Sequence, residues 1–150
     1  MSTIDISAEI EIAAAPADIA GVMFDPEREP EWIKAVAVVE LIDPALEPGA
    51  RVKRTGAFLG QPLAWTTEVE TVHFPHVLAL RIVDGPFTGT VRYDVQRSAG
   101  GSRVRIRSVG DVTRPVLAPA ALLAAPMKAA LAADLERLKA IVEDRGNRVS

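Results

Sequence analysis

The chain contains no cysteine and only two histidines, and these shortages exclude several kinds of chemistry. Without cysteine there is no disulfide, no thiolate nucleophile and no cysteine-ligated metal. His73 and His76 flank a Phe-Pro turn rather than lying on one helical face, and no third ligand is evident, so we expect no metal site. A Ser-His-Asp or Cys-His catalytic site is also hard to build from two histidines near one turn.

Strong net charge and long apolar runs are also missing. The net charge of −3 argues against a strong electrostatic grip on nucleic acid. The longest strongly apolar stretch, residues 116–127, is too short to span a membrane and contains Pro119 and Pro126. Asp5 and Glu9 stand where a signal peptide would be basic and then apolar. We therefore expect a cytoplasmic protein with no transmembrane segment and no nucleic-acid partner.

The length of 150 residues suits a single domain, which we place at 1–145 with a frayed tail at 146–150. Residues 4–12 alternate between apolar and polar, the pattern of a half-buried strand. A short helix is predicted from residue 14 to about Phe24, with Pro16 in its first turn. A second is predicted over 26–34, capped by Asp25 and with Trp32 and Ile33 on its apolar side.

Residues 35–113 read as consecutive strands separated by proline and glycine turns, which favours an antiparallel meander. We place the strands near 35–42, 50–59, 63–73, 77–84, 87–97 and 102–112. The last third is helical, with apolar residues at helical spacing, namely Met127, Leu131, Leu135, Leu138 and Val142. Gly146 should end this helix, Pro126 should kink it or begin its regular part, and residues 115–125 form a separate, looser helical piece.

Strand parity divides the side chains between two faces of the sheet. The outward set is Glu9, Glu11, Lys53, Glu68, Glu70, Arg81, Arg92, Asp94, Arg103, Arg105 and Arg107. The inward set is Ile4, Ile6, Ile10, Val52, Phe58, Trp65, Val69, Leu80, Ile82, Val91, Tyr93, Val95, Val104 and Ile106. If the first and last strands are neighbours, Glu9 and Glu11 face the arginine row.

Five short segments carry a resemblance to a known superfamily. They are Ala15-Pro16-Ala17-Asp18-Ile19, Pro30-Glu31-Trp32, Pro48-Gly49-Ala50-Arg51-Val52, Tyr93-Asp94-Val95 before Gly100-Gly101-Ser102-Arg103-Val104, and Leu135-Glu136-Arg137-Leu138-Lys139. With the order of elements, the chain resembles the START-like (SRPBCC) superfamily, which includes the birch-pollen allergen and the polyketide cyclase/dehydrase and lipid-transport group. The resemblance covers nearly the whole chain and contains no catalytic signature.

The resemblance implies an α+β helix-grip fold, in which a curved seven-stranded antiparallel sheet wraps around the C-terminal helix, with two short helices after strand one. It also implies a cavity for a small hydrophobic molecule such as a lipid or polyketide. Only 5% of residues are aromatic and many helix positions are alanine, so the space under the sheet is poorly filled. The predicted ligand-binding residues are Met23, Trp32, Arg54, Phe58, Trp65, Leu80, Ile82, Phe87, Tyr93, Met127 and Leu131. The Trp32 region and the loop of residues 84–87 would form the mouth.

Two polar residues of this set have alternative interpretations. Arg54 points inward if Lys53 points outward, and a buried guanidinium needs an anionic partner. That partner is a ligand or Asp84, unless the strand bulges near Gly56 and Arg54 reaches solvent. Tyr93 either anchors a ligand carbonyl or is a core tyrosine bonded to the backbone.

Three functions remain open at this point. The first is a binding protein for a small apolar molecule with a polar end, which Arg54 or Tyr93 would orient. The second is an enzyme of the polyketide cyclase or dehydrase kind, cofactor-free and dependent on an inward acid or base. The third is a protein-interaction module like the chaperone-activating branch, with a filled core and an exposed apolar patch. We expect no cofactor, and a homodimer is left open.

Overall fold

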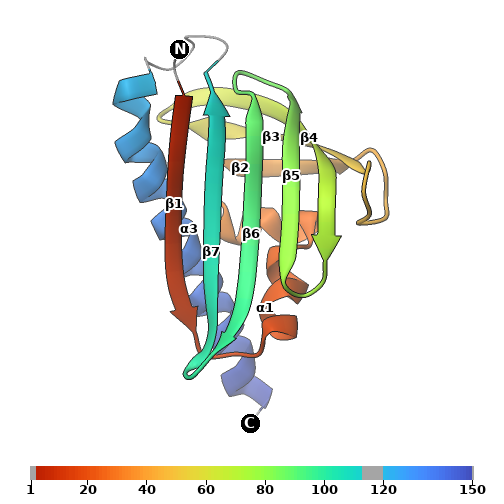
Figure 1. Ribbon diagram of the computed structural model, residues 1–150, viewed down its shortest axis with the longest axis vertical. Coiled ribbons are helices and arrows are strands. Elements are labelled where there is room, and N and C mark those ends of the chain that lie inside the picture. Colours follow the sequence, from red (N-terminus) through yellow and green to blue (C-terminus); the bar gives the residue numbers. More distant parts are fainter. Residues whose placement is uncertain (1–2, 113–119, 150) are drawn as a thin grey trace.

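In the computed structural model, which describes residues 3–112 and 120–149, one antiparallel sheet curves around a long helix (Figure 1). The elements in chain order are β1 (Thr3–Ile12), α1 (Pro16–Met23), the 3-10 helix η1 (Pro26–Arg28), α2 (Glu29–Trp32), β2 (Val36–Leu41), β3 (Arg51–Phe58), β4 (Gln61–His73), β5 (Val77–Asp84), β6 (Gly89–Ser98), β7 (Gly101–Asp111) and α3 (Ala120–Val149). The predicted α+β helix-grip fold is confirmed, and the strands begin and end within two residues of their expected positions.

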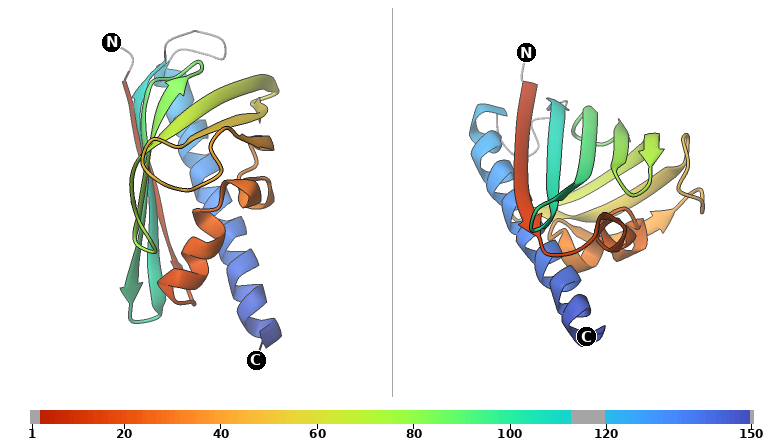
Figure 2. Two further views of the ribbon diagram at one scale, coloured as in Figure 1. Left: turned by 90° about the vertical axis from the view of Figure 1, so that its right-hand side faces the viewer. Right: turned by 60° about the horizontal axis from the view of Figure 1, so that its bottom comes forward.

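The seven strands form one sheet in the order β1-β7-β6-β5-β4-β3-β2, with every neighbouring pair antiparallel. The pairing register shifts between Val36 and Val38 in β2, and at two places in β4. Such bulges bend a strand and increase its twist. The β2–β4 part of the sheet accordingly turns toward the side that carries the helices (Figure 2).

The β3–β4 hairpin has a two-residue turn whose geometry agrees with its sequence. Leu59 and Gly60 both have positive φ, at 51° and 78°. Two such residues match the twist of a tight hairpin, and glycine accepts the conformation without a Cβ penalty. The turn fixes the register in which Arg54 lies opposite Trp65.

The first and last strands are neighbours, and the acidic residues of β1 face the arginine row of β7, as expected for that arrangement. Glu9 pairs with Arg105 in the β1–β7 register, and Glu11 pairs with Arg103. The Arg103 Nε to Glu11 Oε1 distance is 3.2 Å. About half of each of these two side chains, or more, is exposed, so the ion pair favours the register without adding much stability.

The core lies where the C-terminal half of α3 packs on the inner face of the sheet. Val95 and Val104 of the sheet and Leu138 of the helix are fully buried, and Leu135 is 1% exposed. Lys139 Nζ also donates a hydrogen bond to the Glu11 carbonyl at 3.0 Å, which ties this half of the helix to the end of β1. The apolar stripe predicted from helical spacing is therefore the face that contacts the sheet.

The short helices match their predictions, whereas α3 departs from them. Asp25 caps η1 by accepting the Glu27 amide at 3.0 Å, and α2 follows directly. The helix α3 runs from Ala120 through Pro126 and past Gly146 to Val149, so a separate piece before Pro126 and an end at Gly146 are both wrong. A single glycine costs a helix only about 1 kcal/mol, too little to end one of 30 residues. Residues 115–119 lie outside the described residues.

No helix in the described part of the chain combines the length and the apolar character that crossing a membrane requires.

Gly56 of β3 lies against the backbone of the segment that joins α2 to β2. A Cβ at this position would lie 1.7 Å from the Ala35 carbonyl oxygen, whereas a Cβ on Gly21 of α1 would meet nothing within 4 Å. We predict that Gly56→Ala lowers the free energy of unfolding by about 1–3 kcal/mol. Gly21→Ala should raise it by about 0.5–1 kcal/mol, because alanine favours helix. Urea unfolding of both variants tests this, and equal effects would contradict the close approach.

Candidate functional site

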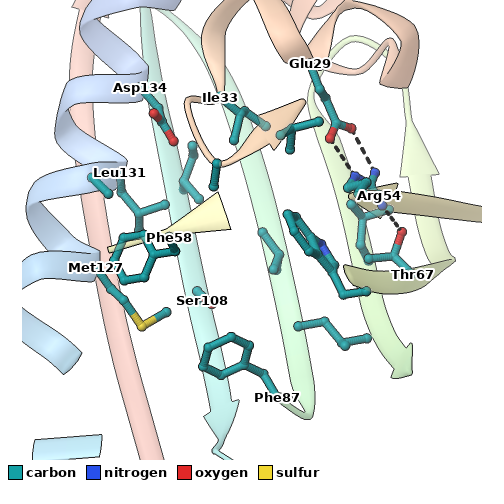
Figure 3. Close-up of a pocket in the computed structure, with 18 of the residues that line it drawn as sticks. Glu29, Ile33, Arg54, Phe58, Thr67, Phe87, Ser108, Met127, Leu131 and Asp134 are labelled. Carbon is teal, nitrogen blue, oxygen red and sulfur yellow. Dashed lines mark hydrogen bonds and ion pairs between the residues drawn. The ribbon is translucent and has the colours of Figure 1, made fainter. Parts of the chain in front are cut away.

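A cavity of about 190 Å³ lies between the inner face of the sheet and α3 (Figure 3). Its walls come from β3 to β7, from Ile6 of β1, from α2 and the start of β2, and from Met127 to Asp134 of α3. Most of the wall is apolar, because inward strand positions carry aliphatic and aromatic side chains. The alanine at position 130 leaves space where a larger residue of α3 would touch the sheet.

The structure brings together all of the predicted ligand-binding residues except Met23. The side chain of Met23 is 1% exposed and packs in the core with α1. Large apolar residues are as common in a core as in a pocket. Ligand binding by the remaining residues stays a prediction.

Exposure divides the cavity into two parts. Phe58, Trp65, Phe87 and Met127 are half-buried, whereas Trp32 is 1% exposed. The Trp32 side chain therefore lies in the interior, and a mouth formed by the Trp32 region and residues 84–87 stays a prediction. Figure 3 shows Phe58 and Met127 on the side of α3, away from the polar group around Arg54.

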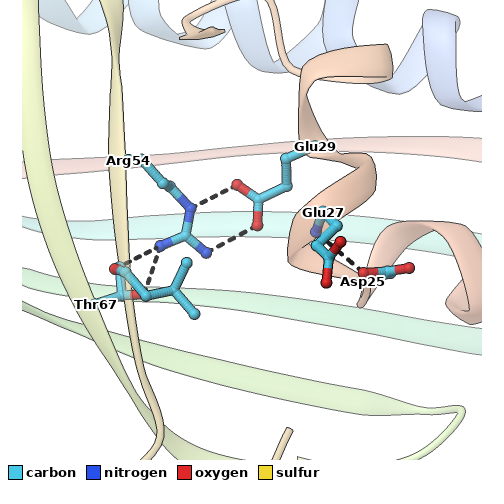
Figure 4. A network of polar contacts seen from close by, with 6 residues as sticks. Asp25, Glu27, Glu29, Arg54 and Thr67 are labelled. Atoms are coloured by element: carbon cyan, nitrogen blue, oxygen red, sulfur yellow. Dashed lines mark hydrogen bonds and ion pairs between the residues drawn. The ribbon is translucent and has the colours of Figure 1, made fainter. Parts of the chain in front are cut away.

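Arg54 is buried and paired with Glu29 of α2 (Figure 4). Arg54 Nε lies 2.5 Å from Glu29 Oε1, and Nη2 lies 2.8 Å from Oε2, so the contact is bidentate. Nη1 donates to Thr67 Oγ1 at 2.6 Å and to the Val52 carbonyl at 3.4 Å. Burial alone would lower the pKa of Arg54, but the hydrogen bonds and charge of Glu29 outweigh it and raise that pKa.

This pairing corrects two interpretations of Arg54. The β3–β4 register is continuous from Arg51 to Phe58, so no bulge in β3 turns Arg54 to solvent. Asp84 is exposed at the end of β5 and is not the partner of Arg54. The guanidinium meets an anion from the protein itself, 25 residues earlier in the chain.

Asp134 of α3 lines the same cavity, on the side away from Arg54 (Figure 3). Its Oδ1 accepts the Lys34 amide at 3.2 Å and also a hydrogen bond from Arg137 Nη2. Arg137 Nε donates to the Trp32 carbonyl at 3.0 Å. Burial raises the pKa of the Asp134 carboxyl, and these contacts oppose the rise without cancelling it.

Tyr93 of β6 points into the cavity with its ring held by aromatic neighbours. Trp32 packs edge-on against it at 5.9 Å between centroids, and Phe24 lies at 6.3 Å. Burial raises the pKa of the Tyr93 phenol far above its usual value, and the Glu29 carboxylate adds to the rise. Among the described residues, none forms a hydrogen bond with the Tyr93 hydroxyl, so the expectation of a backbone-bonded core tyrosine is not met.

Sequence reasoning missed four polar residues that line the cavity: Glu29, Thr67, Ser108 and Asp134. Three of them carried a signal. Thr67 shares the inward parity of Trp65, and Ser108 shares that of Ile106. Asp134 lies three residues after Leu131 and four before Leu138, on the apolar stripe of α3. Glu29 gave none, because a four-residue helix is too short to show a period.

Comparisons with known proteins agree on the family and the fold. The sequence model of the family described as polyketide cyclase/dehydrase and lipid transport matches residues 3–143. No curated protein matches the chain.

Solved structures resemble this chain at low sequence identity. TTHA0849 from Thermus thermophilus is 20% identical with a TM-score of 0.78, covering 94% of this chain and 98% of its own. The Zhui aromatase/cyclase from Streptomyces sp. R1128 is 17% identical with a TM-score of 0.73, covering 95% of each chain. The di-domain ARO/CYC StfQ from the steffimycin biosynthetic pathway is 14% identical with a TM-score of 0.78, and 97% of this chain matches 52% of it. At these identities the likeness shows a common fold alone.

Two glutamates of α2 provide a matched test of the buried ion pair. We predict that Glu29→Ala lowers the free energy of unfolding by about 3–5 kcal/mol, because it leaves the buried charge of Arg54 without a partner. Glu31→Ala should cost less than about 1 kcal/mol, because its pair with Arg28 is partly exposed. Urea unfolding measures both, and a Glu29 effect no larger than that of Glu31 would contradict the role given to the pair.

The raised pKa of Asp134 gives a pH-dependent prediction. A carboxyl group whose pKa is higher in the folded state than its ordinary 3.8 stabilises the fold when protonated, and this contribution is lost as pH rises through the folded-state pKa. Wild type should therefore lose stability relative to Asp134→Asn as pH rises from 3.8 toward neutrality. Unfolding of both proteins across this range isolates the effect, since all other groups are shared. A constant difference between them would contradict it.

Proposed function

The chain belongs to the polyketide cyclase/dehydrase and lipid-transport family, and on that premise we propose that it binds a small hydrophobic molecule between its sheet and α3. The observation that carries the proposal is the cavity itself, with mostly apolar walls and a few polar groups among them. Ligand sites are typically concave, mostly apolar and supplied with a small number of fixed polar groups. The apolar walls would provide most of the affinity, at about 25 cal/mol for each Å² of apolar surface buried.

The cavity volume limits the size of the ligand. A buried apolar cavity of about 150 Å³ accommodates benzene. A volume of about 190 Å³ therefore suits a molecule of one or two rings inside the protein. A longer chain or a larger ring system would have to extend past the half-buried aromatic residues.

A cyclase or dehydratase is the second candidate, and one observation favours it. Such an enzyme needs an inward acid or base. Asp134 lines the cavity, and burial shifts its pKa upward, toward the range in which a carboxyl group can both give and take a proton. Tyr93 could donate a hydrogen bond to a substrate carbonyl in the same space.

The protein-interaction alternative receives less support from this cavity. It requires a filled core, whereas side chains leave about 190 Å³ open between the sheet and α3. The large apolar residues that are exposed within the described chain are also spread over several elements. They are Val38 in β2, Ile42 after it, Leu59 in the β3–β4 turn, Phe74 before β5 and Leu122 in α3.

Neighbouring alanines of α3 provide a matched test of binding in the cavity. Ala130 lines it, and Ala129 is exposed. We predict that Ala130→Trp fills the cavity and weakens binding of the neutral two-ring fluorescent probe 1-naphthylamine by about tenfold or more. Ala129→Trp should leave the affinity unchanged. Probe fluorescence measures both dissociation constants.

Circular dichroism would show whether the two variants keep the fold. If tryptophan at position 130 prevents folding, Ala130→Leu provides a smaller obstruction with the same expected direction. Equal affinity in wild type, the Ala130 variant and the Ala129 variant would place the probe elsewhere and count against the proposed function. Native mass spectrometry of freshly purified protein would reveal a ligand retained from the cell.

A further inference from the structure

The two polar side chains expected to orient a ligand are not equally available to one. The Arg54 guanidinium uses all three of its nitrogens within the protein, on Glu29, Thr67 and the Val52 carbonyl. Its positive charge is opposed by the Glu29 carboxylate at 2.5 Å. A ligand carboxylate could use Arg54 only in competition with Glu29, and separation of a buried pair leaves a charge without a partner.

The Tyr93 hydroxyl is in the opposite situation. Tyr93 is 5% exposed and lines the cavity, and no hydrogen bond joins its hydroxyl to a residue within 3–112 or 120–149. The hydroxyl is not among the fully enclosed polar atoms that lack a partner, so it is accessible from the cavity, where an acceptor on a ligand can take its hydrogen bond. Its raised pKa keeps the phenol protonated, so it remains a hydrogen-bond donor at neutral pH. The indole Nε1 of Trp32, another residue of the cavity wall, is fully buried and has no hydrogen-bond partner in the described part of the chain.

The charges around Tyr93 disfavour an anion. Glu29 offsets the charge of Arg54, and Asp134 contributes either a negative charge or none. Two cations act on Asp134. Arg137 is already engaged with Asp134 and with the Trp32 carbonyl, and Lys34 is exposed and does not line the cavity. A ligand carboxylate would therefore lose its hydration without gaining a free cation, and such burial is costly.

We propose that the cavity selects neutral ligands of one or two rings that carry an acceptor oxygen, which accepts a hydrogen bond from Tyr93, and that it rejects carboxylates of the same shape. The inference rests on the proposed function, because it assumes that the cavity is the binding site. It assigns orientation of the ligand to Tyr93 and gives Arg54 a positioning role through Glu29. The expected ligand class is aryl ketones and similar neutral oxygen compounds.

Three naphthalene compounds separate the contributions to binding. Naphthalene reports the apolar walls, acetylnaphthalene adds a neutral carbonyl, and naphthoate replaces that group with a carboxylate of nearly the same shape. Two-dimensional NMR titration of the full chain at neutral pH gives each dissociation constant. We expect acetylnaphthalene to bind about fivefold tighter than naphthalene. It should bind about tenfold or more tighter than naphthoate.

Two variants test the residues responsible. Tyr93→Phe keeps the ring that packs on Trp32 and Phe24, and it should remove the advantage of acetylnaphthalene while leaving naphthalene unchanged. Glu29→Gln leaves the charge of Arg54 unopposed, and it should strengthen binding of naphthoate by about tenfold. If Glu29→Gln does not fold, the Tyr93→Phe comparison decides the question alone.

The outcomes distinguish this inference from the proposed function. If none of the three compounds perturbs the residues of the cavity, the proposed function fails, and the inference fails with it. If naphthalene binds there but naphthoate binds as tightly as acetylnaphthalene, the cavity is a ligand site and only the selection of neutral ligands is wrong. The same holds if Tyr93→Phe leaves the affinity for acetylnaphthalene unchanged.

Discussion

The ion pair between Arg54 and Glu29 is the constraint on which the closed end of the cavity depends. Arg54 points inward because it alternates with Lys53 along β3, and an inward arginine cannot be buried without an anion. The anion comes from α2, so this helix must lie over the curved end of the sheet. Replacing both members of a buried pair by apolar residues is often neutral for stability, whereas removing one is not. The pair therefore acts mainly to fix the position of α2.

The helix α3 holds the C-terminal end of α2 and the residues that follow it, up to Lys34. Asp134 accepts the Lys34 amide, and Arg137 donates to the Trp32 carbonyl, so the backbone that leaves α2 is bonded to α3. The segment thus spans the opening between the sheet and the long helix, and the cavity is the space left beneath it. The charged side chains that hold the walls in place are already paired with other groups of the protein. What remains for a ligand is apolar surface and uncharged donors such as the hydroxyl of Tyr93.

Most of the fold could be predicted because its signals are local. The alternation of apolar and polar residues predicted the strands, and the positions of proline and glycine predicted the turns between them. The opposed charges of Glu11 and Arg103 were expected to pair if the first and last strands are neighbours, and they do. The end of α3 was not predictable in this way. Gly146 is a helix-ending residue by propensity, but its penalty is small beside the many bonds of a helix that already packs on the sheet over several turns.

The sequence predicted which strand residues line the cavity, but it did not predict which of the polar residues there are paired within the protein. Inward parity placed Trp65 and Tyr93 on its walls, because parity is a property of one strand. Whether Arg54 can serve a ligand depends instead on Glu29, which is distant in sequence and lies in a helix too short to show a pattern. A charged residue at an inward position is easily noticed in a sequence. When the fold buries such a residue, however, it must pair the charge, and the paired group is then not available to a ligand. Tyr93 is uncharged and its side chain lines the cavity, so it needs no ionic partner from the protein, and its hydroxyl, rather than the guanidinium, is left for a ligand.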